Sequence, residues 1–273
     1  MKLSEPTTLR KQSDVEPHEH DRTGHRDVSP GTGGKRAAMG DQVSDWEQLA
    51  DWWLSEVSDP AYEHDVQPLL DMMLAGVDGP TLDLGCGDGR LLDQLPGPVL
   101  GCDLSRYLLE HARRRGMAVV QSDIPELDWL RADSVGLAVG CLVLEHIPDA
   151  IAFFEAAARV VRPGGSLVVV SNHPAYTSGG AGPVVDQSDG EVLWRWGTYL
   201  YDSISTEPAG TGAVVFHHRS LGSLLTTAAR AGWDLRHVSE AGAGPETIAR
   251  VPALQGQDHM PRLIGLRWSR PSA

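Results

Sequence analysis

Short apolar runs alternate with amphipathic segments from residue 81 onwards. Apolar runs bounded by Gly, Pro, Asp or Ser predict buried strands, and segments whose apolar residues recur every three or four positions predict helices. This alternation is typical of a mostly parallel sheet with helices on both faces, an α/β fold. We expect five strands, which read TLDLG, VLGCD, AVVQSD, VGLAVGC and SLVVVS.

Helical spacing is clear in two of the intervals between these strands. The segment SRYLLEHARRRG begins with Ser105, a suitable N-cap, and the segment DAIAFFEAAARVV ends at RPGG. A helix is also expected directly after the first strand, where the apolar pattern resumes behind a glycine-rich turn.

The first 43 residues mix charged residues, Pro, Gly, Ser and His without periodicity, which predicts a disordered tail. Its scattered histidines are expected to be solvated, so we expect no metal site. Order is expected to begin at SDWEQLADWWLSEV, where Ser44 and Glu47 have the spacing of a capping box. A second helix, DVQPLLDMMLAG, is expected to end at Gly76.

Composition excludes several classes of protein. The formal charge of −14 disfavours binding to nucleic acid, which needs a basic surface. The chain has no apolar stretch of the ~18 residues that a membrane span requires, and its start lacks the apolar core of an export signal. Three sparse cysteines fit a reducing compartment and form no disulfide or zinc pattern. We therefore expect a cytoplasmic protein, a monomer or homodimer, with one domain and added segments.

The glycine-rich turn, LDLGCGDG, indicates a ligand that lies against the backbone. Gly85, Gly87 and Gly89 have no Cβ and adopt backbone angles closed to other residues. Their G-x-G-x-G spacing differs from the G-x-G-x-x-G of dinucleotide sites. Asp83, two residues before the first glycine, suits a ligand with a positively charged amino group.

Two further acidic residues stand at strand ends, where ligands bind in such sheets. Asp103 ends the second strand and can accept hydrogen bonds from two ribose hydroxyls. Asp123 follows the third strand and can accept a hydrogen bond from the exocyclic amine of a purine, while Ile124 covers the ring. An amino acid, a ribose and an adenine together describe S-adenosylmethionine.

The chain resembles the class I S-adenosylmethionine-dependent methyltransferases, in particular the small-molecule group of the ubiquinone/menaquinone type. Five stretches match this family's motifs in order: LDLGCGDG, GCDLS, SDIPEL, LVLEHIPD and ARVVRPGGSLVVV. The resemblance implies a Rossmann-like sheet of seven strands, one of them antiparallel. The sixth and seventh strands are then expected at DLRHVSEAG and RLIGLRWS.

The resemblance also divides residues 44–273, the methyltransferase domain, into four parts. They are an N-terminal helical cap (44–79), a cofactor-binding core (80–172), a substrate-side insertion after the fifth strand (173–219) and a final helix with two strands (220–273). The predicted cofactor site comprises Tyr62, Asp83, Gly85, Cys86, Gly87, Asp103, Leu104, Asp123, Ile124, Cys141 and Leu142. Cys86 is expected to fill space rather than act as a nucleophile, because acidic neighbours raise the pKa of a thiol.

Methyl transfer to a hydroxyl or carbon acid requires a base, and three histidines are candidates. His146 follows the fourth strand, where several O-methyltransferases of this group carry a catalytic histidine. His173 follows the fifth strand. His218 is favoured over His217, since alternation along a strand sends the two side chains to opposite faces.

Aromatic residues of the insertion are candidates for a lid over a flat acceptor. They are Tyr176, Trp194, Trp196 and Tyr199. They could equally serve to pack the insertion onto the sheet. The sequence favours neither possibility.

The predicted function is S-adenosylmethionine-dependent methylation of a small, aromatic or heteroaromatic metabolite in natural-product biosynthesis. Oxygen is slightly favoured over nitrogen or carbon as the accepting atom, because a histidine near the sulfonium suits a hydroxyl. One alternative is a non-catalytic partner protein that retains the cofactor site. Another is a nicotinamide oxidoreductase, which the glycine spacing disfavours.

Overall fold

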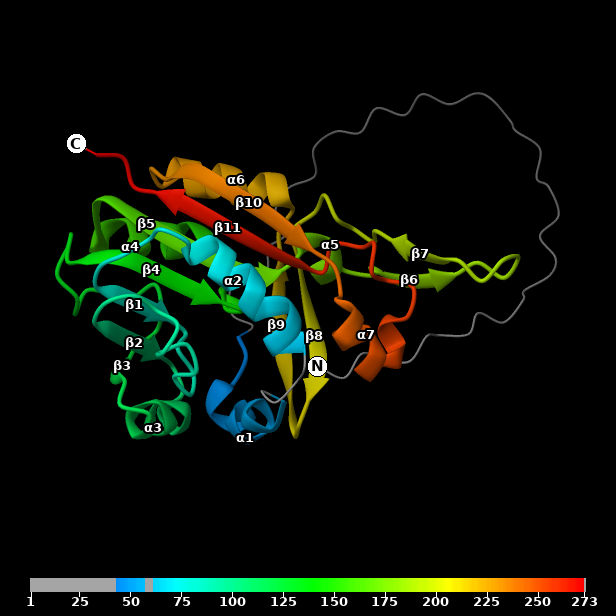
Figure 1. Ribbon diagram of the computed structural model, residues 1–273, viewed down its shortest axis with the longest axis horizontal. Coiled ribbons are helices and arrows are strands. Elements are labelled where there is room, and N and C mark those ends of the chain that lie inside the picture. Colours follow the sequence, from blue (N-terminus) through cyan, green and yellow to red (C-terminus); the bar gives the residue numbers. More distant parts are fainter. Residues whose placement is uncertain (1–42, 57–60, 273) are drawn as a thin grey trace, which may run out of the picture.

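A seven-stranded sheet forms the centre of the computed structural model, which describes residues 43–56 and 61–272 (Figure 1). The strand order is β10-β11-β5-β4-β1-β2-β3, and β11 runs antiparallel to both of its neighbours. All seven strands overlap predicted stretches, although β5 begins at Val161, before the predicted SLVVVS. Their bounds are Thr81–Leu84 (β1), Val99–Asp103 (β2), Ala118–Gln121 (β3), Val135–Cys141 (β4), Val161–Asn172 (β5), Asp234–Ala241 (β10) and Leu263–Ser269 (β11).

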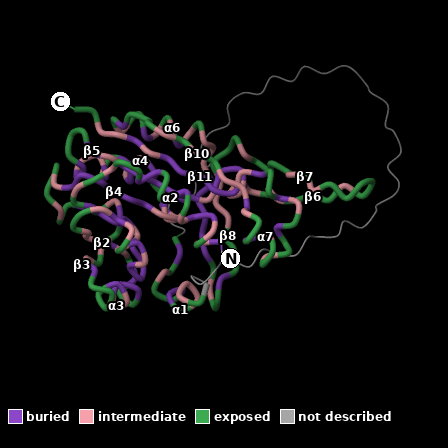
Figure 2. The backbone as a smooth tube through the Cα atoms, in the orientation of Figure 1, coloured by how far each residue is buried: buried purple, intermediate pink, exposed green. Residues whose placement is uncertain are grey.

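Helices cover both faces of this sheet because its central strands are apolar on both sides. Alternate residues of β5 illustrate the two faces: Leu167 and Val169 pack with α4 and α6, whereas Val168 and Val170 pack with α2. Figure 2 shows the buried residues concentrated in the sheet between these layers. The helices are Trp46–Glu56 (α1), Gln67–Leu74 (α2, preceded by a π-helical turn η1, Tyr62–Val66), Arg106–Arg114 (α3), Ala150–Val160 (α4), Pro174–Thr177 (α5), Leu221–Arg230 (α6) and Pro245–Arg250 (α7).

Helix α3 begins at the predicted cap. The Ser105 hydroxyl accepts a hydrogen bond from Leu108 N, and Asp149 caps α4 in the same way through Ala152 N. Gly76, with φ of 73°, follows α2, as predicted for the end of that helix.

The helix predicted directly after the glycine-rich turn is wrong. Residues 90–95 form consecutive turns, with Leu92 N donating to Gly89 O and Gln94 N donating to Leu91 O. The segment lies between Gly89 and Pro96, and a residue before proline disfavours helical angles. Such a short interval gives too few helical hydrogen bonds to offset the cost of starting a helix.

The predicted capping box at the start of α1 is also wrong. The Ser44 hydroxyl accepts a hydrogen bond from Val215 N at 2.8 Å, and Asp45 instead accepts from Gln48 N. The Glu47 carboxylate accepts hydrogen bonds from the Ser105 hydroxyl at 2.7 Å and from Tyr107 N at 3.2 Å. Both side chains serve contacts distant in sequence, which local spacing does not reveal.

The insertion after β5 consists of α5 and two hairpins. Strands β6 (Gly182–Val185) and β7 (Val192–Arg195) form a hairpin that projects from the body at the right of Figure 1. Strands β8 (Ser203–Ala209) and β9 (Gly212–His218) form a second hairpin, against which α1 packs. Thus α1 and β9 are neighbours although the sequence separates them widely.

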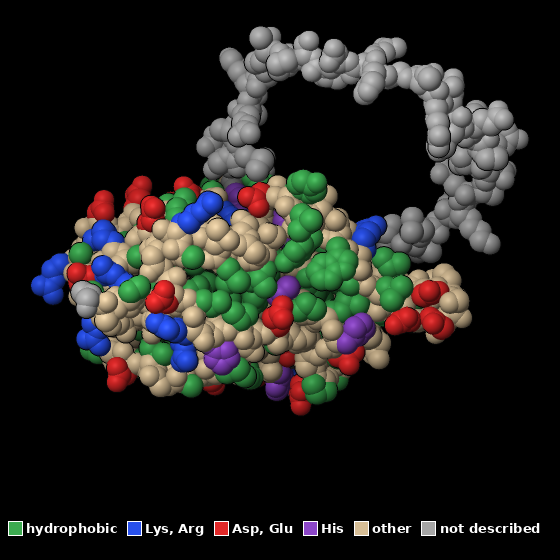
Figure 3. Space-filling model, turned by 90° about the horizontal axis from the view of Figure 1, so that it is seen from above, with side chains coloured by type: hydrophobic (Ala, Val, Ile, Leu, Met, Phe, Trp, Pro, Cys, Tyr) green, Lys and Arg blue, Asp and Glu red, His purple; other side chains and the backbone are tan. Residues whose placement is uncertain are grey.

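The surface combines both signs of charge with apolar regions. On the face shown in Figure 3, hydrophobic side chains gather near the middle, and acidic side chains are interspersed with basic ones. Across the described ranges 43–56 and 61–272, every helix is too short or too polar to cross a bilayer.

Candidate active site

A cleft opens at the carboxyl ends of the central strands, between α1, η1 and the β8–β9 hairpin. The volume of the cleft is about 940 Å³ when the space open to solvent is included. The lining is mostly aromatic and aliphatic, with a few polar groups. Its residues are Trp46, Trp52, Trp53, Ala61, Tyr62, Val66, Arg90, Leu142, His146, Asn172, Glu207, Pro208, Ala209, Val214, Phe216, Arg262 and Leu263.

The glycine-rich turn lies beside this cleft in the conformation that its sequence predicts. Gly85, with φ of 71°, packs so closely on Val143 that a Cβ would lie 2.5 Å from a methyl carbon of that side chain. Gly87, with φ of 52°, faces the indole of Trp53. Glycine is needed here both for the backbone angles and for the close approach.

Asp103 ties the turn to the end of β2. One carboxylate oxygen accepts a hydrogen bond from Gly87 N at 2.9 Å, and the other accepts from Ser105 N at 2.8 Å. Burial raises the pKa of Asp103, and the backbone N–H groups oppose that shift. Each oxygen keeps a second lone pair, so the carboxylate can still accept hydrogen bonds from a diol.

The surroundings of the Asp83 carboxyl group show whether a cationic amino group fits beside the glycine-rich turn. Its carboxyl group is buried, and the Oδ2 atom has no hydrogen-bond partner among the described residues. Burial, together with the negative charges of Asp103 and Asp88, raises the pKa of Asp83 to about 7. A cationic amino group would satisfy the free oxygen and favour the ionised form, so the residues present fit an amino-acid moiety.

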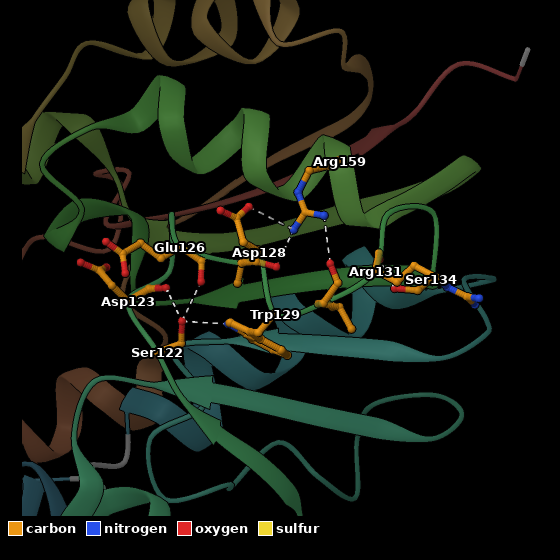
Figure 4. Close-up of polar contacts among 10 residues, drawn as sticks. Ser122, Asp123, Glu126, Asp128, Trp129, Arg131, Ser134 and Arg159 are labelled. Atoms are coloured by element: carbon orange, nitrogen blue, oxygen red, sulfur yellow. Dashed lines mark hydrogen bonds and ion pairs between the residues drawn. The ribbon is translucent and has the colours of Figure 1, made fainter.

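Asp123 and Ile124 occupy a loop that is pinned at several points (Figure 4). The Ser122 hydroxyl bonds to the carbonyls of Asp123 and Glu126 and accepts a hydrogen bond from the Trp129 indole. Arg159 of α4 donates to Leu130 O. The Asp123 side chain is exposed and Ile124 is buried, and their contact with an adenine stays a prediction.

The remaining residues predicted for the cofactor have three kinds of surroundings. Tyr62 and Leu142 line the cleft, and Leu142 has a φ of 56°, which is uncommon for a side chain of its size. Cys86 is buried, Cys141 is partly buried, and burial raises the pKa of both thiols, so neither has the character of a nucleophile. Leu104 is exposed at the end of β2.

His146 is the predicted base that the structure places in the cleft. Its Nδ1 lies 2.8 Å from Val215 O, and its ring contacts Trp46 and Phe216. A carbonyl oxygen only accepts hydrogen bonds, so Nδ1 carries the proton and Nε2 keeps its lone pair. No hydrogen bond to Nε2 comes from the residues that the structure describes, so this nitrogen is able to accept a proton.

His173 and His218 lie outside the cleft lining and have structural partners. His173 Nδ1 accepts a hydrogen bond from Ala175 N, so Nε2 donates to Glu240 at 2.8 Å. Burial lowers the pKa of His173, and Glu240 opposes that shift. His218 Nδ1 pairs with the Thr177 hydroxyl, and Nε2 lies 2.9 Å from Tyr199 O.

The four aromatic residues of the insertion predicted to contact the acceptor, Tyr176, Trp194, Trp196 and Tyr199, also lie outside the cleft lining. Tyr176 stacks on Trp194 at a centroid distance of 4.4 Å, and the Tyr176 hydroxyl donates to Gln257. Trp196 contacts Tyr199 edge-on, and the Tyr199 hydroxyl accepts a hydrogen bond from Leu221 N. These contacts attach the insertion to the core.

Several cleft residues were not predicted as site residues. Trp46, Trp52 and Trp53 of α1 and Phe216 of β9 supply its aromatic wall. The clustering of three tryptophans on one short helix was the available signal. Glu145 was also missed: its buried carboxylate accepts hydrogen bonds from Ser171 Oγ, Asn172 N and Asn172 Nδ2, and so fixes the loop after β4 to β5.

The strand order, the glycine-rich turn after β1 and the acidic residue at the end of β2 define the class I S-adenosylmethionine-dependent methyltransferase fold. Comparison with known families agrees, since residues 82–169 match the family described as "Methyltransferase domain". Residues 82–169 are thus similar to a methyltransferase domain, and S-adenosylmethionine is the cofactor that this similarity and the fold indicate.

Known relatives and structures are similar to different shares of the chain. The ubiquinone biosynthesis O-methyltransferase of Alkalilimnicola ehrlichii is 34% identical over 139 residues, 43% of this chain and 53% of that protein. The chain spans about half the length of the curated relatives it matches. An S-adenosylmethionine-dependent methyltransferase structure from Mesorhizobium loti has a TM-score of 0.66 and 27% identity, covering 76% of this chain and 99% of that one. A structure from Listeria monocytogenes, with a TM-score of 0.62 and 22% identity, covers 79% of this chain and 100% of that one and supports the fold alone.

Proposed function

We propose that this chain transfers a methyl group from S-adenosylmethionine to a hydroxyl group of a small aromatic metabolite. The observation that carries the proposal is His146, whose Nε2 lone pair is uncommitted in an aromatic cleft beside the glycine-rich turn. The relatives named ubiquinone biosynthesis O-methyltransferase support oxygen as the accepting atom. The acceptor-side segments added to the sheet favour a specialised role, and we propose natural-product biosynthesis.

The chain's own residues supply binding and proton transfer. When bound, the cofactor supplies an electrophilic methyl group on a positively charged sulfur, and Asp83, Asp103 and Asp123 would hold its amino, ribose and adenine parts. The aromatic side chains of α1 and β9 orient a flat acceptor and exclude water.

His146 accepts the hydroxyl proton at Nε2 as the oxygen–carbon bond forms, and becomes an imidazolium. The Val215 carbonyl and the nearby Glu207 carboxylate stabilise that positive charge. Burial raises the pKa of Glu207, while the charge of His146 lowers it, so the two groups interact.

The first test is a screen of phenols and catechols for formation of S-adenosylhomocysteine, followed by His146→Gln on the best acceptor. We expect kcat to fall by roughly 10²–10⁴-fold, the usual contribution of a positioned base, with unchanged affinity for S-adenosylhomocysteine. His259→Gln, an exposed histidine in the loop before β11, is the control. A His146→Gln variant with wild-type kcat between pH 6 and 9 would remove this residue from the base role.

A further inference from the structure

Arg262 lies in the wall of the cleft, directly before β11. Its backbone is fixed on both sides, because Arg262 N donates to Ala241 O and Arg262 O accepts a hydrogen bond from His173 N, each at 2.8 Å. The next residue, Leu263, pairs with Asn172 at the end of β5. The position of Arg262 beside the carboxyl end of β5 is therefore set by the sheet.

The charge of Arg262 is incompletely compensated. Its side chain is 8% exposed, and its contact with the Asp65 carboxylate, from Nη1 to Oδ2, is 3.5 Å long. The Nε atom is buried and has no hydrogen-bond partner among the described residues. The other oxygen of Asp65 accepts a hydrogen bond from Gly244 N at 3.0 Å. A guanidinium group has five N–H donors, and leaving them unpaired in a buried site is costly.

The other charged groups of the cleft wall are differently placed. Arg90 stacks its guanidinium 4.4 Å from the centroid of the Tyr62 ring, and its Nε pairs with Asp88 at 3.3 Å. Glu207 lies on β8 and interacts with His146. Arg262 thus combines a place in the cleft wall with unpaired donors, whereas the remaining lining is mostly aromatic or aliphatic.

We propose that Arg262 binds a carboxylate carried by the methyl acceptor, which makes aromatic hydroxy acids the substrate class. This inference rests on the proposed function, of which it specifies the acceptor. A guanidinium group matches a carboxylate through two parallel hydrogen bonds and discriminates against neutral groups. Asn172 on β5 lies between Arg262 at β11 and the segment after β4 that carries His146. The acid group and the reacting hydroxyl would therefore occupy different regions of one aromatic cleft.

The experiment compares matched carboxylates and carboxamides by calorimetric titration of the full chain saturated with S-adenosylhomocysteine. The probes are 4-hydroxybenzoate against 4-hydroxybenzamide, and 3,4-dihydroxybenzoate against its amide. We expect at least one carboxylate to bind ten or more times tighter than its amide. Arg262→Met should abolish this preference and Arg262→Lys should keep part of it. Arg267→Met is the control, because Arg267 lies on β11, the strand that Arg262 precedes, and donates to the carbonyls of Met73 and Ala75.

A variant with Arg262→Met and Asp65→Asn together guards against misfolding, since it leaves no unpaired buried charge. Thermal melting checks its fold, and loss of the preference in this folded variant supports the assignment. Equal affinity of the wild type for both members of each pair would overturn it, as would a preference that survives Arg262→Met. If the chain prefers carboxylates but methylates no hydroxy acid or phenol, the proposed function is wrong. Arg262 would then still be a carboxylate-binding residue.

Discussion

At the scale of single residues, Asp83 is unusual because a carboxyl group is buried with one oxygen unpaired. Its pKa rises from the ordinary value of 3.8 to about 7, chiefly through burial. In the ligand-free chain between pH 4 and 7, the folded state therefore keeps a proton that the unfolded state loses. The contribution of Asp83 to the free energy of unfolding therefore falls as pH rises through that window. A bound cation removes this destabilisation, because it favours the ionised carboxylate.

Binding of S-adenosylhomocysteine, whose amino group is protonated, should therefore be coupled to ionisation of Asp83. The dissociation constant should fall by up to about tenfold per pH unit between pH 5 and 7 and level off above pH 7. Calorimetry in buffers with different ionisation enthalpies should detect a released proton at pH 6 but none at pH 8. Asp83→Asn should bind more weakly and lose this pH dependence; a pH-independent wild type would contradict the coupling.

The predicted site residues that the structure brings together are those linked by a fixed spacing along the chain. The glycine-rich turn, Asp83 and Asp103 come together through β1 and β2, which are adjacent in the sheet. The position of His146 also follows from the strand that precedes it. Arg262, Glu207 and Phe216 could not be assigned to the cleft in this way, because only the packing of distant segments brings them there.

At the scale of elements, α1 connects the two halves of the site. Glu47 accepts hydrogen bonds from the beginning of α3, next to Asp103, and Ser44 accepts one from β9, next to the carbonyl that holds His146. The helix that begins at these contacts carries the three tryptophans of the cleft. Its position therefore determines both the acceptor wall and the surroundings of the glycine-rich turn.

Ser44→Ala should leave the buried Val215 N without its hydrogen-bond acceptor. We expect a loss of about 1–3 kcal/mol in the free energy of unfolding and a higher KM for the acceptor, with a smaller effect on the cofactor. Denaturant unfolding and steady-state kinetics measure these effects. Ser134→Ala, which removes a hydroxyl bonded to the exposed carbonyl of Arg131, should change stability by under about 0.5 kcal/mol. Equal effects of the two substitutions would mean that the Ser44 contact has no special role.

Elements with a clear run or regular spacing of apolar residues were predicted well, and short irregular elements were not. The apolar runs of β4 and β5 are buried along most of their length, so their pattern is unambiguous. The turns after Gly89 and the hairpins of the insertion lack such a pattern. The aromatic residues near β7 were plausible lid residues in sequence, but stacking within the insertion accounts for their contacts.

At the scale of the whole molecule, the residues predicted for the cofactor and those of the proposed acceptor cleft lie on different parts of the fold. Asp83 and Asp103 lie on the sheet itself, whereas α1, β8 and β9 form the aromatic wall. A ligand that binds the folded chain alone stabilises it by mass action. Melting experiments can thus report on the cofactor side before any acceptor is known.

S-adenosylhomocysteine at a hundredfold excess over its dissociation constant should stabilise the wild type by about 2.7 kcal/mol. Asp103→Ala should weaken ligand binding by about 1–3 kcal/mol, because charge-assisted hydrogen bonds to the ribose are lost. The shift in melting temperature at a fixed ligand concentration should fall accordingly. Asp189→Ala, in the β6–β7 loop, should retain the full shift. If Asp103→Ala does so too, the ribose binds elsewhere.

The bond from Val215 N to the Ser44 hydroxyl joins positions 171 residues apart. Each of the two segments it connects forms part of the wall that the acceptor meets, and neither belongs to the sheet. Evolution of a new acceptor preference would then proceed by correlated change in α1 and in the β8–β9 hairpin, with the part of the core that lies between them in the sequence left untouched. For the same reason, a chimaera designed to redirect this scaffold must import α1 and the β8–β9 hairpin from a single parent.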